Sequence, residues 1–449
     1  MPPANWPRKA RCWISITAKT RTTARCPVPT NSCCCRKCRI CAPRSATCAT
    51  CCVTADELIQ PGTPAFRRVC LALVIASLVV FANLYAIHPL LPLIAERYNI
   101  STLQASNAFT LTNLMLALSL LVHGPLSDTL GRRGPLIIGI GLTALLTLCM
   151  AFAEDFTTLL WLRAMLGLCL GVLPAVAIAY LGDSISRTAL TAAVGLYIAG
   201  NTLGGAGGRL AGGFIAEHLG LQAVFLALAG FSLVGLLIIA LMLPKPAGFT
   251  PQPLSLRGSF RAFANHLGNP RLLPAFVLGG LNFMVFINLY TYLTFRLSAA
   301  PWLLGASSLG LLFLTYLAGT LSAAIAGRLQ GRSNALPGMA LGVLLLIGGT
   351  LLTLANPLWL IVAGLLANAF GFFLTHSLAN AWVNQQAQHS KASASSLYSV
   401  TYYLGSALGV YYLDPFWRLG AWPMVVLGAV LILLLNLLLI GYMHRRLQR

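Results

Sequence analysis

Long apolar stretches recur along this chain, and they constrain its fold more than any other feature of the sequence. Each is about long enough to cross the roughly 30 Å hydrocarbon core of a bilayer as a helix. Because lipid offers backbone amides no hydrogen-bond partners, such stretches predict helices. Only 9% of the residues are charged, too few to cover the surface of a water-soluble protein of this length. We therefore expect an all-α membrane protein with twelve spans, at 69–94, 104–123, 134–153, 156–181, 188–215, 221–243, 272–295, 307–327, 335–355, 358–381, 394–415 and 421–443.

The connection over residues 244–271 stands apart because it is long, rich in proline and basic. It contains four Lys or Arg residues and no acidic residue. It divides the twelve stretches into two blocks of six. The sequence therefore predicts two six-helix bundles, over 65–243 and 272–449, joined by a linker at 244–271.

Residues 1–52 hold ten of the thirteen cysteines and ten Lys or Arg residues, with no Leu, Gly, Phe, Asp or Glu. This composition cannot build a packed core, and it lacks the apolar segment of a signal peptide. Two Cys-x-x-Cys pairs, at 38–41 and 48–51, also allow a zinc knuckle, but the spacer of six residues between them is short for one. We expect a disordered tail over 1–64 and no metal site, with 1–52 either dispensable or an extension upstream of the true start codon.

The placement of Lys and Arg predicts the orientation in the membrane. Beyond residue 52, fifteen basic residues fall in connections or termini on one face, and three fall on the opposite face. Basic residues favour the cytoplasmic side. We therefore expect both termini in the cytoplasm. The formal net charge of +21 reflects this face and the tail, and it does not indicate a nucleic-acid partner.

A short run between the second and third stretches reads Gly-Pro-Leu-Ser-Asp-Thr-Leu-Gly-Arg-Arg, over 124–133. Its glycines permit close helix approach and a tight turn, and its aspartate can accept hydrogen bonds or pair with a base. The run resembles the cytoplasmic loop signature of the major facilitator superfamily. The resemblance implies a loop that packs between the bundles and gates the outward-facing state; the alternative is a tight loop that only follows the positive-inside bias. The gating residues would be Gly124, Asp128, Gly131, Arg132 and Arg133.

The fifth stretch carries glycines at a spacing that clears one helix face for close helix contact. The pattern resembles the antiporter motif of the same superfamily, in which a proline follows the third glycine. Arg209 stands at that position here, so antiport rests on the glycines alone. The packing glycines would be Gly195, Gly204, Gly208, Gly212 and Gly213.

Two arginines, Arg163 and Arg209, fall inside predicted spans, where a charge is costly and points to function. Arg163 begins the run Arg-Ala-Met-Leu-Gly, which resembles the R-x-x-Q-G motif that the superfamily uses to assist proton transfer, with Leu166 in place of glutamine. A snorkelling arginine near a helix end is the alternative. None of the nine acidic residues lies mid-span. The partner of Arg209 would then be the substrate itself, or helix carbonyls and water would satisfy both arginines.

Three further residues at membrane depth complete the candidates for transport or coupling. His376 can carry a proton at physiological pH, although a hydrogen-bonded structural histidine is the alternative. Tyr197 and Asn201 are polar residues of the fifth stretch that could line the transport path. With Arg163 and Arg209, these residues make up the predicted transport and coupling set.

No H-E-x-x-H, G-x-S-x-G or P-loop pattern occurs, so the sequence predicts neither an enzyme nor a cofactor. Over 65–449 the chain resembles bacterial inner-membrane permeases of the superfamily that are described as arabinose-efflux or drug-efflux transporters. The resemblance implies a monomeric secondary transporter that exports a small organic solute by alternating access, coupled to protons. A facilitator or importer, and a non-transporting sensor or scaffold on the same fold, are the alternatives.

Overall fold

The structure is a computed structural model, and it describes residues 58–251, 256–330, 335–389 and 391–447. Predictions for residues 1–57, which include the cysteine-rich segment and its two Cys-x-x-Cys pairs, lie outside these residues. From residue 58 onward the chain forms one compact unit.

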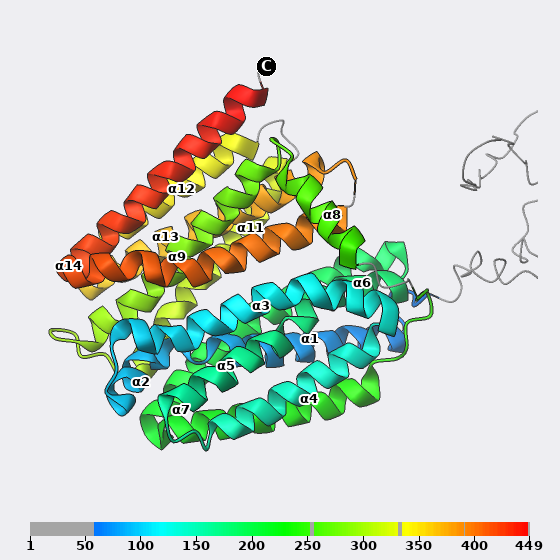
Figure 1. Ribbon diagram of the computed structural model, residues 1–449, viewed down its shortest axis with the longest axis horizontal. Coiled ribbons are helices and arrows are strands. Elements are labelled where there is room, and N and C mark those ends of the chain that lie inside the picture. The colour runs from blue at the N-terminus through cyan, green and yellow to red at the C-terminus, as the bar shows by residue number, and fades with distance from the viewer. Residues whose placement is uncertain (1–57, 252–255, 331–334, 390, 448–449) are drawn as a thin grey trace, which may run out of the picture. The chain divides into compact units, whose positions relative to one another are not determined.

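The unit is built of helices, which Figure 1 labels in chain order. Before the linker come α1 (Pro64–Tyr85), α2 (Leu91–Tyr98), α3 (Thr102–Leu130), α4 (Arg133–Met150), α5 (Phe156–Leu170), α6 (Val172–Ser184) and α7 (Arg187–Met242). The linker contains α8 (Leu256–Leu267). After it come α9 (Leu273–Ser298), α10 (Ala306–Leu311), α11 (Leu317–Gln330), α12 (Ala335–Leu352), α13 (Leu358–Gln386) and α14 (Lys391–Leu447). Short 3₁₀ helices connect α1 to α2 (η3, His88–Leu90) and α10 to α11 (η4, Leu312–Tyr316).

The described chain has ten helical segments long and apolar enough to cross a membrane. Two of them, α7 and α14, are 56 and 57 residues long, far more than one crossing needs. Each contains non-helical backbone, at Gly220 in α7 and at Gly420 and Ala421 in α14. Each of these helices therefore supplies two crossings, and the ten segments correspond to the twelve predicted stretches. The protein is an all-α, multi-pass membrane protein.

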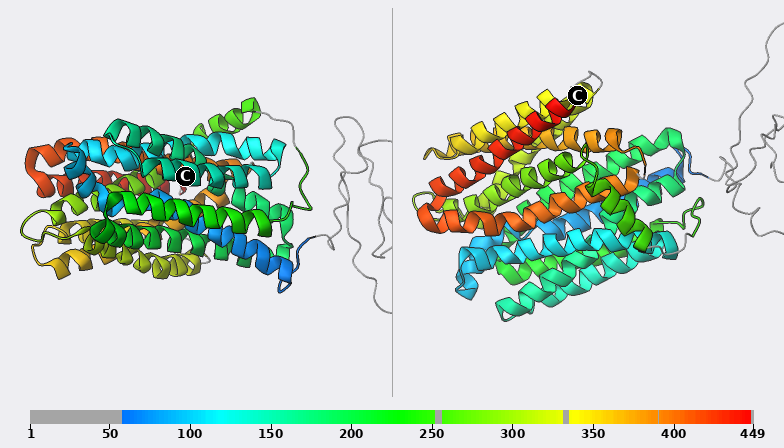
Figure 2. Two further views of the ribbon diagram at one scale, coloured as in Figure 1. Left: turned by 90° about the horizontal axis from the view of Figure 1, so that it is seen from below. Right: turned by 45° about the horizontal axis from the view of Figure 1, so that its top comes forward.

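The helices pack in two groups, which we call the N-bundle (α1–α7) and the C-bundle (α9–α14). The most extensive contacts inside the N-bundle join α1 to α7 and α3 to α5, and those inside the C-bundle join α9 to α14 and α12 to α13. The two bundles meet mainly where α3 touches α14 and where α7 touches α10. Figure 2 shows the bundles side by side, with most helix axes running in one common direction.

One end of the unit, which we call the basic end, is defined by the α3–α4 turn with Arg132 and Arg133. Ile59 lies at this end and exchanges two backbone hydrogen bonds with Ser184 and Ser186, of 3.0 and 3.1 Å. Thr63 then caps α1 by accepting a hydrogen bond from the Phe66 amide. The predicted disordered tail over 1–64 is therefore too long, because residues 58–64 are held by backbone bonds and a helix cap.

Helix α8 was absent from the expected elements. Its sequence, LRGSFRAFANHL, places apolar residues at positions 256, 260, 263 and 267. This spacing is the signature of an amphipathic helix. The linker's prolines and basic residues concealed a helix that contacts both α3 and α14.

Candidate functional site

The predicted gating loop is mostly helix. Helix α3 continues to Leu130 with Pro125 inside it, so only Gly131 and Arg132 separate α3 from α4. Gly131 ends α3 with φ 94°, a conformation that favours glycine. Gly124 has no neighbour within 4 Å of a Cβ built on it, so it does not serve the predicted close helix approach.

The charged groups of this turn bind one another and the ends of N-bundle helices. Arg132 forms an ion pair with Asp128 one turn before it, and its Nε donates to Asp183 of α6 at 3.0 Å. Arg133 donates to the backbone oxygens of Leu243 and Ala240, at 2.6 and 2.7 Å. Asp183 was not among the predicted residues, because sequence spacing gives no sign that α6 ends beside this turn. All these partners belong to the N-bundle or to the start of the linker.

The glycines of α7 let it lie directly on α1. A Cβ at Gly204 would lie 2.8 Å from the Cα of Leu78, and one at Gly208 would lie 2.6 Å from the Cα of Ala82. A Cβ at Gly212 would similarly lie 2.8 Å from the backbone oxygen of residue 86. These distances leave no room for a side chain, so α1 and α7 touch backbone to backbone.

Two glycines of α7 differ from this set. Gly213 faces the other bundle, where a Cβ would lie 2.3 Å from the backbone oxygen of Ala306 in α10. The packing role predicted for Gly195 is wrong, because this residue is exposed and nothing lies within 4 Å of a Cβ built on it. Gly200, which the motif does not include, makes the contact with α1 instead: a Cβ there would lie 3.0 Å from the Ser77 Cβ.

Arg163 of α5 is buried, with 2% of its surface exposed, and its guanidinium binds backbone oxygens of α1 and α3. It donates to Ala108 at 2.9 Å, to Asn83 at 3.0 Å and to Leu84 at 3.3 Å. Asn83 and Leu84 belong to the last turn of α1, where helix carbonyls lack partners within their own helix. The negative end of a helix also favours a cation. Arg163 therefore caps α1 inside the N-bundle.

Arg209 of α7 is as deeply buried as Arg163, with 2% exposed, but its surroundings differ. Its guanidinium carbon lies 4.0 Å from the ring centre of Tyr85, 4.4 Å from that of Phe313 and 4.8 Å from that of Tyr316. Nη1 donates to the Gly205 carbonyl at 3.2 Å, whereas Nε and Nη2 have no hydrogen-bond partner among the described residues. Arg209 therefore joins the N-bundle to aromatic residues of the C-bundle.

The structure separates the other polar candidates from Arg209. His376 lies within the C-bundle, where its Nδ1 is 3.0 Å from the Tyr398 hydroxyl and its ring packs against Tyr402. Tyr197 is buried and Asn201 half-buried, and they lie about three and two turns before Arg209 in α7, nearer the basic end. The predicted transport set is therefore spread over three places and does not form one cluster.

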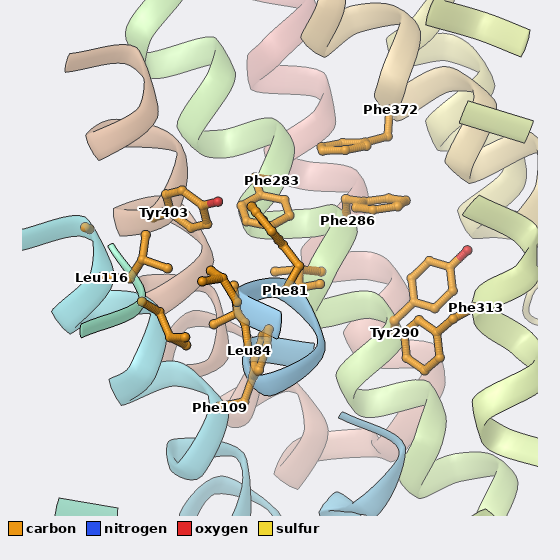
Figure 3. Packing of buried hydrophobic residues seen from close by; sticks show 14 of the residues in the cluster. Phe81, Leu84, Phe109, Leu116, Phe283, Phe286, Tyr290, Phe313, Phe372 and Tyr403 are labelled. Atoms are coloured by element: carbon orange, nitrogen blue, oxygen red, sulfur yellow. The ribbon is translucent and has the colours of Figure 1, made fainter. Parts of the chain in front are cut away.

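His88 of η3 lies at the bundle interface. Its Nε2 is 2.7 Å from the Thr291 hydroxyl of α9, and its ring stacks between Phe109 and Phe313 at 4.6 and 4.9 Å. Figure 3 shows Phe109 on the N-bundle side and Phe313 beside Tyr290 on the C-bundle side. Phe313 thus contacts both His88 and Arg209. His88 was not among the predicted transport residues, since a histidine before a proline carries no signal of a partner 203 positions away.

Similarity to known proteins extends over most of this unit. The family model described as Major Facilitator Superfamily matches residues 73–410. An uncharacterized MFS-type transporter of Bacillus subtilis, YybF, is 34% identical over 389 residues, which cover 86% of this chain and 96% of that protein. The inner membrane transport protein YnfM of Escherichia coli is 35% identical over 393 residues, covering 88% and 94%.

Solved structures show the same fold. A bacterial homologue of the human lysosomal transporter Spinster, in an inward-facing and unoccupied conformation, superposes with a TM-score of 0.70 at 17% identity, over 86% of this chain and 98% of that one. A peptide transporter, POT, in complex with sulfate superposes with a TM-score of 0.72 at 15% identity, over 87% and 98%. The solved structures share the fold of this chain, its curated relatives are described as transporters, and the chain belongs to the major facilitator superfamily.

Proposed function

We propose that this transporter moves a small organic solute across a bacterial inner membrane by alternating access, in the direction of export and coupled to protons. The N-bundle and the C-bundle, over 65–243 and 272–449, are the two moving units, and 244–271 is the cytoplasmic linker between them. The basic end faces the cytoplasm, as the excess of Lys and Arg there favours. The protein acts as a monomer.

One observation carries the alternating-access proposal: the bundles touch unequally along α7. Toward the end of its first crossing, Gly213 meets Ala306, and the Glu217 carboxylate accepts a hydrogen bond from the Ser307 amide at 2.7 Å. Toward the basic end, Gly195 of the same helix has open space around it. We call the first region the Glu217 end. A closed contact at one end and a free helix face at the other is the arrangement that a rocking pair of bundles adopts in one of its two states.

Two observations support proton coupling and export. The glycine pattern of α7 resembles an antiporter motif, and multidrug resistance proteins MdtG match part of this chain, such as that of Klebsiella pneumoniae at 32% identity over 190 residues. His88 and His376 are the titratable groups at membrane depth that could carry a proton. A facilitator of the same fold would need neither.

The full chain, reconstituted in liposomes that contain a pH-sensitive dye, tests the proposal. We expect an imposed pH gradient to drive uptake of at least one compound in a metabolite and drug panel, and that compound to dissipate the gradient. Flux that does not depend on the pH gradient would support a facilitator instead. If no compound is transported, the sensor or scaffold would be supported.

Two variants on α7 serve as a matched pair in this assay. Gly213→Leu places a side chain where the bundles touch, so closure at the Glu217 end is blocked and flux is lost. Gly230→Leu places the same side chain at an exposed position in the second crossing of α7, where nothing lies within 4 Å of a built Cβ, so flux is retained. Equal flux through both variants would contradict alternating access through this contact.

A further inference from the structure

Arg209 lies between the two bundles, and one hydrogen-bonding edge of its guanidinium has no partner among the residues the structure describes. Its Nη1 is held by the Gly205 carbonyl, which fixes the plane of the guanidinium. The two nitrogens without partners, Nε and Nη2, lie on one edge of that plane. This edge presents two parallel N–H groups, the arrangement that binds a carboxylate through both of its oxygens.

No protein group balances the charge of Arg209 among the described residues. The ion pairs of that part of the chain involve Arg132 and Arg418. Glu217 is the next acidic residue along α7, but eight positions of helix put it roughly 12 Å away along the axis. Its carboxylate is also engaged by the Ser307 amide. A buried and unpaired cation is costly, so a partner supplied by the substrate would stabilise it.

The rings around Arg209 restrict the kind of partner. Tyr85, Phe313 and Tyr316 offer aromatic faces within 4.8 Å of the guanidinium carbon, and these faces suit an apolar or aromatic body. The hydroxyl of Tyr316 is buried and has no hydrogen-bond partner in the part of the chain that the structure describes, so it can donate to the same anion. A single cation in this low-dielectric setting neutralises one negative charge, so a dianion such as phosphate would remain unbalanced.

We propose that the free edge of Arg209, with the Tyr316 hydroxyl, binds the carboxylate of a monoanionic organic substrate whose apolar body packs on the surrounding rings. The inference rests on the proposed transport function and gives it a substrate class. Tyr85 and Arg209 belong to the N-bundle, whereas Phe313 and Tyr316 belong to the C-bundle. Separation of the bundles therefore moves two of the three rings away from the guanidinium and admits the anion, and closure of the bundles brings the Tyr316 hydroxyl back to it.

Binding to the purified full chain tests this site without the need for transport. The probes are benzoate, phenylacetate and octanoate, each compared with its uncharged amide, in calorimetric titrations of the protein in detergent. We expect at least one carboxylate to bind about tenfold or more tightly than its amide, because only the carboxylate accepts both N–H groups and balances the charge. Equal binding of acid and amide, or no binding of any carboxylate, would overturn the proposal.

Variants of Arg209 locate the binding. Arg209→Lys keeps the charge but loses the paired N–H edge, so carboxylate affinity falls about 10- to 100-fold, and Arg209→Gln abolishes it. Arg418→Gln, at an exposed arginine paired with Asp414, is the control and leaves affinity unchanged. Gel filtration and melting temperature show that each variant is folded. Parent-like carboxylate binding by folded Arg209→Gln would assign the site elsewhere.

The site and the transport function can fail separately. Liposome flux of a neutral or cationic compound that Arg209→Gln leaves intact would refute the anionic substrate and retain the transporter. Carboxylate binding that depends on Arg209, in a protein that moves no compound, would retain the site and refute transport.

Discussion

Arg163 and Arg209 are equally buried, yet their charges are stabilised by different kinds of contact. Arg163 donates to three backbone oxygens, all within the N-bundle. Arg209 has one such bond and lies between aromatic rings of both bundles, and two of its nitrogens have no partner within the described segments. The contacts of Arg163 stay intact when one bundle moves against the other, whereas the contacts of Arg209 with the C-bundle rings are broken. Contacts inside a bundle should therefore govern stability, and contacts between bundles should govern the transport cycle.

The largest difference is expected between Arg163→Leu and Arg209→Leu. Loss of Arg163 leaves three buried carbonyls without a donor, so the free energy of unfolding falls by about 3 kcal/mol or more. Loss of Arg209 removes one hydrogen bond and three ring contacts, but it also removes the cost of a buried unpaired charge, so the free energy of unfolding changes by less than about 1 kcal/mol. Chemical denaturation in detergent measures both. Equal destabilisation by the two substitutions would break the comparison.

The second test places one side chain on each side of α7. Gly208→Leu drives a side chain into the backbone of α1, and overpacking of this kind costs about 1–3 kcal/mol. Gly213→Leu meets α10 of the other bundle, which can move away, so its melting temperature stays close to that of the parent. Thermal unfolding of the two proteins compares them directly. A larger loss for Gly213→Leu than for Gly208→Leu would mean that the bundles do not separate at this contact.

Asp128→Asn tests whether a contact inside one bundle can also affect transport. Asp128 pairs with Arg132 inside the N-bundle, yet its loop signature predicts a gating role. Its side chain is 46% exposed, so loss of the ion pair with Arg132 costs at most about 1 kcal/mol. We nevertheless expect transport to slow about tenfold, since Arg132 also holds Asp183 and the α3–α4 turn would lose its anchor in one state. Initial flux and melting temperature, measured on the same preparation, separate the effects. If Asp128→Asn is stable and transports at the normal rate, the ion pair has only a structural role.

The smallest effect is expected at Glu217, which lies between the two crossings of α7. The hydrogen bond from the Ser307 amide lowers the pKa of its carboxyl. A lowered pKa means that the ionised group favours closure of the Glu217 end above the ordinary glutamate value of about 4.3, and that this contribution is lost as the pH falls through the lowered pKa.

Spin labels at the exposed positions 219 and 303 report the opening at this end. We expect a modest increase in their separation in acid for the parent, and none for Glu217→Gln, whose amide does not titrate over this range. An identical acid response in both proteins would place the sensitive group elsewhere.

Much of the fold could be predicted because length and apolar character define a membrane span regardless of its neighbours. The twelve stretches are present, and the kinks of α7 and α14 lie at the gaps between predicted spans. The loop predicted from Gly124 and Pro125 was wrong, because α3 continues through both residues to Leu130. Polar composition similarly concealed α8.

The candidate sites were harder to predict, because their partners carry no side-chain signal. Arg163 could be singled out as a buried charge, but backbone carbonyls of α1 and α3 can belong to any residue type. The ring cage of Arg209 joins residues of α1, α7 and η4 that are far apart in sequence. The open space beside Gly195 depends on how the bundles are placed, which a motif within one helix does not encode.

The glycine face of α7 also has a genetic consequence. Any missense change in a glycine codon introduces a residue with a Cβ atom, and at positions 204, 208 and 212 that atom would lie within 2.8 Å of the α1 backbone. No conservative replacement exists at these positions, in contrast to the leucines that face lipid. Random mutagenesis should therefore recover almost no active clones altered there, and this helix should mark the least tolerant stretch of the gene.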